Sequence, residues 1–517
     1  MVAVAVVATA ARGLRVPYPI LLVVGGLLLA LTPAVPHVEL APELIFLLFL
    51  PPLVYIAGFD TSLRDIKAQV RPILSLAVGL VLASTLVVGV IAHAVLSEVS
   101  WPIAFALGAM LSATDSIAAT ALLRDIGAPR RVVTLLESES LFNDATALVA
   151  YQAALGAAAT ASFSPAGAGA RILVAGVGGV LVGLAVGVGV AWLRRRLSDA
   201  PVEITVSLLT PFAAYLPAER LGVSGVLATV TTGVLVGWFA PRIMESDTRV
   251  RGRAVWEFLV FALNGLVFIL IGLQLSTVVS GQLGRSLPGL LASMAVIAAA
   301  VILVRLGWVF AAAALTSGFR RLRHAHEPPR PWRETVVVGW AGLRGVVSLA
   351  LALALPLSIA GRDVLLFVTF GVILVTLVGQ GLTLPLVTRL VRIGGDGTAG
   401  REEVRARTVA AEAAVARIEE LAREWPGHLP LIDTLRSQYQ HRATHLGEDR
   451  FGGDGSNGAP PDAAAEQELL EHRLIRRAVI DAERGAVLRL RDGGAINDDV
   501  WRRVERDLDL EELRMEA

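Results

Sequence analysis

The stretch LESESLFNDATALVAY, residues 136–151, decides what kind of molecule this chain forms. Its first half carries polar and acidic side chains within about two helical turns, and its second half continues as an apolar helix-forming run. Similar apolar runs recur around it, and hydrophobic side chains make up 55% of the 517 residues. A helix crosses a bilayer when it has about 20 mostly apolar residues. The sequence therefore predicts an all-α polytopic membrane protein with polar groups at bilayer depth.

The apolar runs follow one another along the first three quarters of the chain, separated by Arg, Pro or Gly. They cover residues 1–11, 19–35, 41–58, 72–96, 101–122, 133–158, 172–193, 202–218, 223–240, 255–277, 288–315, 334–359 and 363–388. We predict about 13 transmembrane helices from these runs, although the first run is shorter than a crossing helix needs.

Basic residues are distributed unevenly between the loops. Loops after odd-numbered runs hold 22 Lys and Arg, whereas loops after even-numbered runs hold only Arg171, Arg220, Arg285 and Arg362. Cytoplasmic loops of membrane proteins carry the excess of Lys and Arg. The alternation supports thirteen crossings and predicts an outside N-terminus and a cytoplasmic C-terminus. We expect the chain to lie in a bacterial plasma membrane.

The composition changes after the last apolar run. Residues 1–395 hold 28 Lys and Arg against 19 Asp and Glu, whereas residues 396–517 hold 18 against 26. We predict a transmembrane domain over 1–392, a linker over 393–400 and a cytoplasmic helical domain over 401–517. The absence of cysteine excludes disulfides and thiolate chemistry, and His441 and His445 are interpreted as part of a solvated helix face rather than half of a metal site.

Polar groups cluster in only a few of the predicted spans. Besides residues 136–151 they occur in LSATDSIAAT (111–120), VILVRLGWVF (301–310) and GWAGLRGVVSLALAL (339–353). An ionisable group at bilayer depth costs about 2.5–3.5 kcal/mol on insertion scales, so each demands a partner or a function.

Helical spacing sorts the acidic run into two faces. Ser140 and Asp144 share one face at i,i+4, and Glu139 and Asn143 share a neighbouring face. A buried Glu is tolerated mainly when it is paired. We expect Glu139 to form a structural ion pair with Arg305, and Arg344 is the alternative partner.

The remaining carboxylates either take part in transport or lie at the membrane interface without a transport role. Glu137 is interpreted equally well as a residue of the cytoplasmic helix end near Arg130 and Arg131. Asp115 and Asp144 lie deeper, and desolvation disfavours their charged form, so a proton and a cation compete to neutralise them. The two glycines that flank Leu343 and Arg344 suit a locally unwound helix facing a cavity. From spacing and analogy we expect two inverted six-helix repeats with crossed broken helices.

These motifs resemble the monovalent cation/proton antiporter family, which includes bacterial sodium/proton antiporters and animal sodium/proton exchangers. The run LESESLFND (136–144) is similar to the family's E-x-E-S-x-x-N-D signature, and Thr114–Asp115 and GLRG (342–345) support the resemblance. The sequence departs from the family where Ala113 and Ser116 flank Thr114–Asp115 in place of a common Pro, and where Ile56 replaces a common Glu.

The resemblance implies a site and a mode of transport. It implies that Asp144 is the exchanged carboxylate, that Na⁺ binds at Asp144 and Asp115, and that Thr114 and Ser140 line the site. It also implies the Glu139–Arg305 pair and a supporting role for Asn143 and Arg344 where the broken helices cross. Asn before the key Asp implies electroneutral exchange, and the family implies a homodimer that moves by an elevator-like step.

The sequence therefore predicts a transporter for pH homeostasis that exchanges Na⁺, or K⁺ or Li⁺, for protons, with no cofactor and no enzymatic activity. Its expected partners are membrane lipid, monovalent cations and a second copy of the chain, and no nucleic acid. A cation channel, a K⁺/H⁺ antiporter, an intramembrane aspartyl protease and a nutrient symporter are the alternatives. The sequence contains no TVGYG-like filter, which would favour a channel, and no GxGD motif around the aspartates, which would favour a protease.

Overall fold

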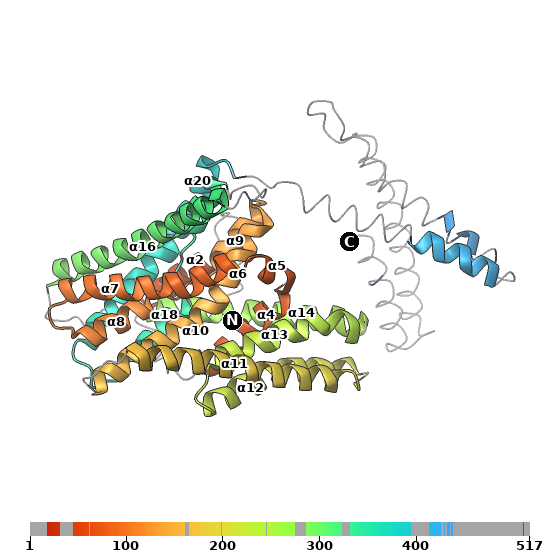
Figure 1. Ribbon diagram of the computed structural model, residues 1–517, viewed down its shortest axis with the longest axis horizontal. Helices are drawn as coiled ribbons and strands as arrows, with labels where there is room; N and C mark the ends of the chain where they lie inside the picture. The colour runs from red at the N-terminus through yellow and green to blue at the C-terminus, as the bar shows by residue number, and fades with distance from the viewer. Residues whose placement is uncertain are drawn as a thin grey trace, which may run out of the picture. The chain divides into compact units, whose positions relative to one another are not determined.

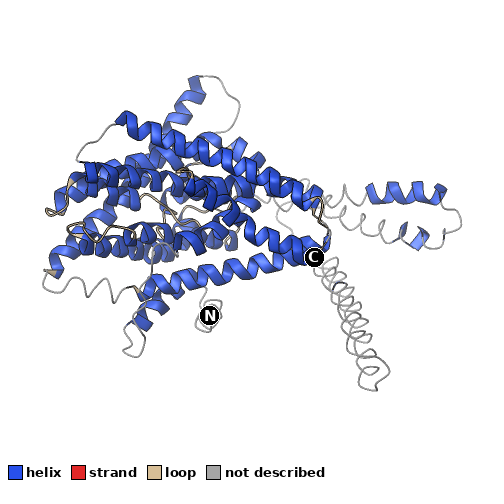
Figure 2. Ribbon diagram, turned by 90° about the horizontal axis from the view of Figure 1, so that it is seen from below, coloured by secondary structure: helices blue, strands red, loops and turns tan. Residues whose placement is uncertain are grey.

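The computed structural model describes residues 18–30, 45–61, 63–160, 165–197, 199–244, 246–274, 286–322, 331–393, 413–424, 429, 432–434, 436–437 and 510. The chain divides into two compact units, Met1–Asp396 and Gly397–Ala517. All regular structure in the described ranges is helical, which confirms the all-α prediction for them (Figure 2). His441 and His445 and the first apolar run lie outside the described residues.

The first half of the membrane unit consists of short and interrupted helices followed by one long helix. They are α2 (Tyr18–Ala30), η1 (Ile45–Phe49), α4 (Leu50–Asp60), α5 (Leu63–Ala68), α6 (Val70–Leu74), η2 (Ser75–Leu80), α7 (Val81–Val95), α8 (Trp101–Met110), α9 (Ile117–Asp125) and α10 (Arg130–Thr160). The η segments are single π-helical turns that continue into an α-helix without a break in the chain direction.

The second half begins with long continuous helices. They are α11 (Pro165–Arg194), α12 (Ala200–Arg220), α13 (Gly225–Ile243), α14 (Ser246–Leu273), α16 (Leu287–Leu322), α17 (Trp332–Trp340), α18 (Val346–Leu353), α19 (Arg362–Leu374), η3 (Val375–Gln380) and α20 (Gly381–Leu390). Local chemistry sets several starts: Pro lies in the first turn of α8 and α12, and the Ser224 hydroxyl accepts from the Leu227 amide at 3.2 Å to cap α13.

The helices coincide with every predicted apolar run that the described residues cover. Six of them are long and apolar enough to cross a membrane: Val70–Val95, Gly169–Arg194, Gly225–Ile243, Thr248–Leu273, Leu287–Thr316 and Arg362–Leu390. Tyr18–Ala30, Phe46–Asp60 and Trp101–Met110 are shorter apolar helices. The count of thirteen crossings therefore stays a prediction.

By their packing, the helices of the membrane unit, which are labelled in Figure 1, form two groups. In the first bundle α4, α11 and α12 pack against α13, and α2 packs against α14. Small residues allow the closest approach, because a Cβ on Gly58 of α4 would lie 2.9 Å from the carbonyl oxygen of Val230 in α13. We call this group, α2, α4 and α11–α14, the first bundle.

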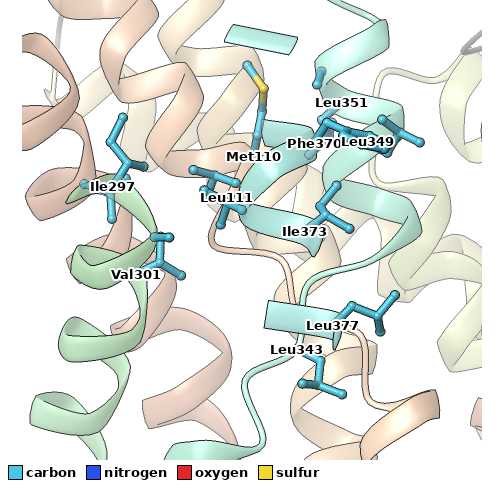
Figure 3. Packing of buried hydrophobic residues seen from close by; sticks show 14 of the residues in the cluster. Met110, Leu111, Ile297, Val301, Leu343, Leu349, Leu351, Phe370, Ile373 and Leu377 are labelled. Atoms are coloured by element: carbon cyan, nitrogen blue, oxygen red, sulfur yellow. The ribbon is translucent and has the colours of Figure 1, made fainter. Parts of the chain in front are cut away.

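The other group, α6–α10 and α16–α20 with η2 and η3, we call the site bundle. In it α8 packs against α7 and α10, and α16 packs against α7, α17 and α19. A continuous cluster of buried apolar side chains forms its core and extends to Val23 of α2 and Phe268 of α14 in the first bundle. Figure 3 shows part of this cluster, including Met110 and Leu111 at the end of α8, Ile297 and Val301 of α16 and Leu349 of α18.

Two interruptions lie inside the site bundle. The chain is non-helical over 111–116, between α8 and α9, and over 341–345, between α17 and α18. Both segments are mostly buried, so their backbone groups need partners other than a helix ladder. These partners create the candidate site.

Candidate cation-binding site

The two interruptions meet through the backbone. The amide of Asp115 donates to the carbonyl oxygen of Leu343 at 2.8 Å, and the amide of Arg344 donates to Thr376 Oγ1 at 3.2 Å. The Asp115 carboxylate accepts from the amide of Ile117 at 2.9 Å and so caps the start of α9. Hydrogen bonds to side chains and to the backbone of the other interruption thus replace the missing helical hydrogen bonds. They stabilise the break between α8 and α9 without a proline.

Arg344 binds the end of α8. Its Nη1 donates to the carbonyl oxygens of Ser112 at 2.5 Å and Ala113 at 2.9 Å, and the residue is fully buried. Ser348 adds a hydroxyl 3.3 Å from the Ala113 carbonyl oxygen. A cation at a helix C-terminus is favourable because the last carbonyls carry partial negative charge. The guanidinium therefore supplies the donors that the end of α8 lacks.

Glu139 of α10 and Arg305 of α16 form a buried ion pair. Arg305 Nη2 donates to Glu139 Oε2 at 2.8 Å, Nη1 donates to Oε1, and both residues are only 1% exposed. Arg305 also donates to the carbonyl oxygen of Val338 from Nη2 at 3.1 Å. Of the two partners that the sequence left open for Glu139, Arg305 is the one in contact, and the pair links α10 to α16 and α17.

Three side chains of α10 hold the interruption between α8 and α9 at Thr114. Ser140 Oγ donates to the Thr114 carbonyl oxygen at 2.8 Å, and Asn143 Nδ2 donates to Thr114 Oγ1. The Thr114 hydroxyl lies 3.4 Å from Glu139 Oε1 and donates to it. The polar face of residues 136–151 therefore orders the unwound backbone next to Asp115.

Asp144 lies on the same helix, one turn beyond Ser140. It is 8% exposed, and its Oδ1 has no hydrogen-bond partner. Asp144, Asp115 and Ser140 all line a cavity of about 900 Å³, and its lining from the first bundle includes Tyr18 and Asn264. A buried carboxylate oxygen without a partner is costly unless a proton or a cation occupies it. The cavity thus reaches both aspartates from between the bundles.

Glu137 lies apart from this centre, toward the surface. It accepts from Arg124 Nη2 at 2.5 Å, and its side chain is 29% exposed. The sequence offered Arg130 and Arg131 as its neighbours, but Arg131 pairs with Glu334 of α17. Glu137 therefore pairs with Arg124 in the more exposed part of the cavity lining, and its position at a membrane interface stays a prediction.

Sequence reasoning missed polar groups in the first bundle. Arg194, which the sequence placed among loop residues, is buried at the end of α11, and its Nη2 lies 3.6 Å from Glu203 of α12. Asn264 of α14 is also buried and lines the cavity. Neither stands out in the sequence, because Arg194 opens an Arg-Arg-Arg run typical of a loop and Asn264 is a single amide in an apolar helix. In the described part of the chain, no three His, Cys, Asp or Glu side chains converge as a transition metal requires.

Comparison with known proteins identifies the family. The family model described as "Sodium/hydrogen exchanger, transmembrane" matches residues 1–390. A protein of Mycobacterium tuberculosis named as an uncharacterized Na⁺/H⁺ exchanger is 35% identical over 511 residues, covering 97% of this chain and 92% of the relative. The Na⁺/H⁺ antiporter ApNhaP of Aphanothece halophytica is 35% identical over 408 residues, covering 78% of this chain and 75% of the relative.

The fold is also that of a solved protein. The sodium proton antiporter MjNhaP1 from Methanocaldococcus jannaschii superposes with a TM-score of 0.60 at 21% identity, covering 75% of this chain and 95% of that structure. The resemblance that the E-x-E-S-x-x-N-D motif indicated is confirmed by the family model and by the relatives over almost the whole chain. The chain belongs to the transmembrane sodium/hydrogen exchanger family, a family of cation/proton antiporters.

Proposed function

We propose that the chain exchanges Na⁺ for H⁺ at Asp144, with cation and proton competing for the same carboxylate. The observation that carries this proposal is the position of Asp144, buried beside Asp115 in the cavity with Oδ1 unpartnered. Desolvation penalises the bare anion, and either a proton or a monovalent cation relieves that penalty. The site therefore changes from one side of the membrane to the other readily when Asp144 carries either ion. The same change is unfavourable when the carboxylate is charged and unoccupied.

The oxygen atoms around the cavity suit a hard monovalent cation. Asp115 and Asp144 supply carboxylates, Ser140 supplies a hydroxyl, and Thr114 presents its backbone and hydroxyl oxygens nearby. Alkali cations prefer such oxygen ligands. Arg305 neutralises Glu139, so the Glu139 carboxylate does not compete with Asp144 for the transported cation.

Na⁺ is the first candidate substrate, and K⁺ or Li⁺ the second. A relative from Bacillus pumilus, 34% identical over 390 residues, is named a sodium, potassium, lithium and rubidium/H⁺ antiporter. The choice among these ions depends on cavity size and ligand geometry. The test therefore compares Na⁺, K⁺ and Li⁺ directly.

The architecture suggests how the site is exposed to each side. We propose thirteen crossings arranged as two inverted repeats, with α8–α9 and α17–α18 as the corresponding broken helices. The site bundle moves against the first bundle, which forms a homodimer in the bacterial plasma membrane. We propose that residues 401–517, most of which lie outside the described residues, form a cytoplasmic helical domain, and that exchange serves pH homeostasis.

We also propose electroneutral exchange. Asn143 stands before Asp144 and donates its amide to Thr114, so this position adds no second titratable carboxylate. One cation then replaces one proton, and no net charge crosses in a cycle. A voltage across the membrane is expected to leave the exchange rate unchanged.

Everted vesicles that contain the protein test these proposals. A pH gradient is imposed across the vesicle membrane, and Na⁺, K⁺ or Li⁺ is added. Collapse of the gradient is followed once with the membrane potential clamped at zero and once with it clamped at a physiological value. Gradient collapse that needs the cation, ignores the voltage and disappears in Asp144→Asn supports the proposal. Wild-type exchange by Asp144→Asn overturns the site assignment, and cation current without proton movement indicates a channel.

A further inference from the structure

Asn264 is a buried polar residue in the wall of the cavity. It lies on α14, in the first bundle, and the same cavity is lined by Asp115 and Asp144. The residue is 2% exposed, and its Oδ1 has no hydrogen-bond partner. Buried amide oxygens are nearly always satisfied, so an unpartnered one on a residue that lines a cavity is a candidate ligand atom.

The segment of α2 next to Asn264 lines the same cavity. Tyr18 of α2 is one of its lining residues. The Tyr18 ring packs against Phe261, one helical turn before Asn264 on α14, with ring centroids 5.9 Å apart. In this packing the side-chain oxygen of Asn264 is left without a hydrogen bond.

The position of Asn264 on α14 supports the same reading. The cavity-lining residues of this helix recur at helical spacing, among them Arg249, Arg253, Trp256, Glu257, Val260 and Asn264. Asn264 is the last of them along the chain and the only polar one after Glu257.

We propose that Asn264 Oδ1 is a ligand of the transported cation, supplied by the first bundle when the aspartates face it. This inference rests on the proposed function. An amide oxygen attracts a cation but takes up no proton at ordinary pH. Asn264 therefore strengthens cation binding without strengthening proton binding, and so biases the competition at Asp144 toward the cation.

The test replaces the oxygen and leaves the shape. In everted vesicles, the Na⁺ concentration for half-maximal exchange (KM) and the maximal rate are measured for Asn264→Leu and Asn264→Asp. We expect Asn264→Leu to raise KM by about tenfold, the loss of one contact to a charged partner, at a nearly unchanged maximal rate. Asn264→Asp keeps an oxygen at the same place, so its KM at alkaline pH stays near or below the wild-type value.

The control is Phe258→Leu, because Phe258 lies on α14 but is 66% exposed and does not line the cavity. Its KM is expected to match the wild type. An unchanged KM in Asn264→Leu, or an equal rise in Asn264→Leu and Asn264→Asp, overturns the proposal. If Asn264→Leu does not yield folded protein, Asn264→Ala takes its place with the same criteria. Asp144→Asn is measured in parallel. If Asp144→Asn still exchanges ions, the proposed function is wrong. If Asp144→Asn is inactive but Asn264→Leu has an unchanged KM, only the role of Asn264 is wrong.

Discussion

The Glu139–Arg305 pair and the Arg253–Glu257 pair have the same chemistry in different surroundings. The first is 1% exposed on both sides, whereas the side chains of the second are 82% and 68% exposed. A buried charge that loses its partner cannot recover its hydration, whereas an exposed one can. The two pairs therefore differ in what their removal costs.

We predict that Glu139→Leu lowers the stability of the protein by about 3–5 kcal/mol, because it leaves the Arg305 guanidinium buried without a counter-charge. The measurement is the thermal unfolding transition of the purified protein in detergent. Glu257→Leu, which removes an exposed i,i+4 pair, is expected to cost less than about 1 kcal/mol. Equal losses in the two variants would contradict a structural role for the buried pair.

At the scale of the helices, the sequence indicated one interruption better than the other. Gly342 and Gly345 predicted an unwound segment, and the chain is non-helical over 341–345. The interruption over 111–116 contains no proline that would indicate it in the sequence. It depends on Arg344, which binds the carbonyl oxygens at the end of α8 from the other interruption, more than 200 residues away in the sequence. No local pattern contains that contact.

The same limit applies to the site. The i,i+4 spacing of residues 136–151 correctly separated the Glu139 face from the Asp144 face, because helix periodicity is a local property. Arg194–Glu203 and Asn264 could not be found in this way. Their burial results from how α11, α12 and α14 pack, and single polar residues at helix ends and in apolar helices carry no signal of it.

We predict that Gly345→Ala impairs exchange, because a Cβ at this position would lie 2.7 Å from the Cβ of Asp115 and displace that residue. Exchange is measured in vesicles at saturating Na⁺. The control is Gly307→Ala on α16, where a Cβ meets nothing within 4 Å. That variant is expected to exchange normally and to gain up to about 1 kcal/mol of helix stability. Normal exchange by Gly345→Ala would show that Asp115 need not stay where it lies.

At the scale of the molecule, the cavity lies where the two bundles meet, and both aspartates open into it. Competition at this site has a definite pH dependence. Protons occupy Asp144 increasingly as pH falls, so more Na⁺ is needed to displace them. We predict that the Na⁺ KM rises with falling pH, approaching about tenfold per pH unit where the site is mostly protonated. The measurement is exchange in vesicles at several pH values, and a KM that is constant with pH would contradict competition.

The division into two units gives another prediction. The family model ends at residue 390, and the first compact unit ends at Asp396. We predict that a chain ending at Asp396 retains Na⁺-dependent proton exchange in vesicles, since every proposed ligand lies before that residue. Exchange is compared with the full chain at equal protein content. Complete loss in a folded truncated protein would assign the second unit a part in transport itself.

The most direct test of the central claim is proton release on cation binding. Na⁺ is added to purified protein in a weakly buffered solution that contains a pH-sensitive dye, at a pH where Asp144 is largely protonated. We predict that about one proton leaves for each Na⁺ bound, and that Asp144→Asn releases none. Na⁺ binding by the wild-type protein without any release of protons would contradict the claim that the two ions share one carboxylate.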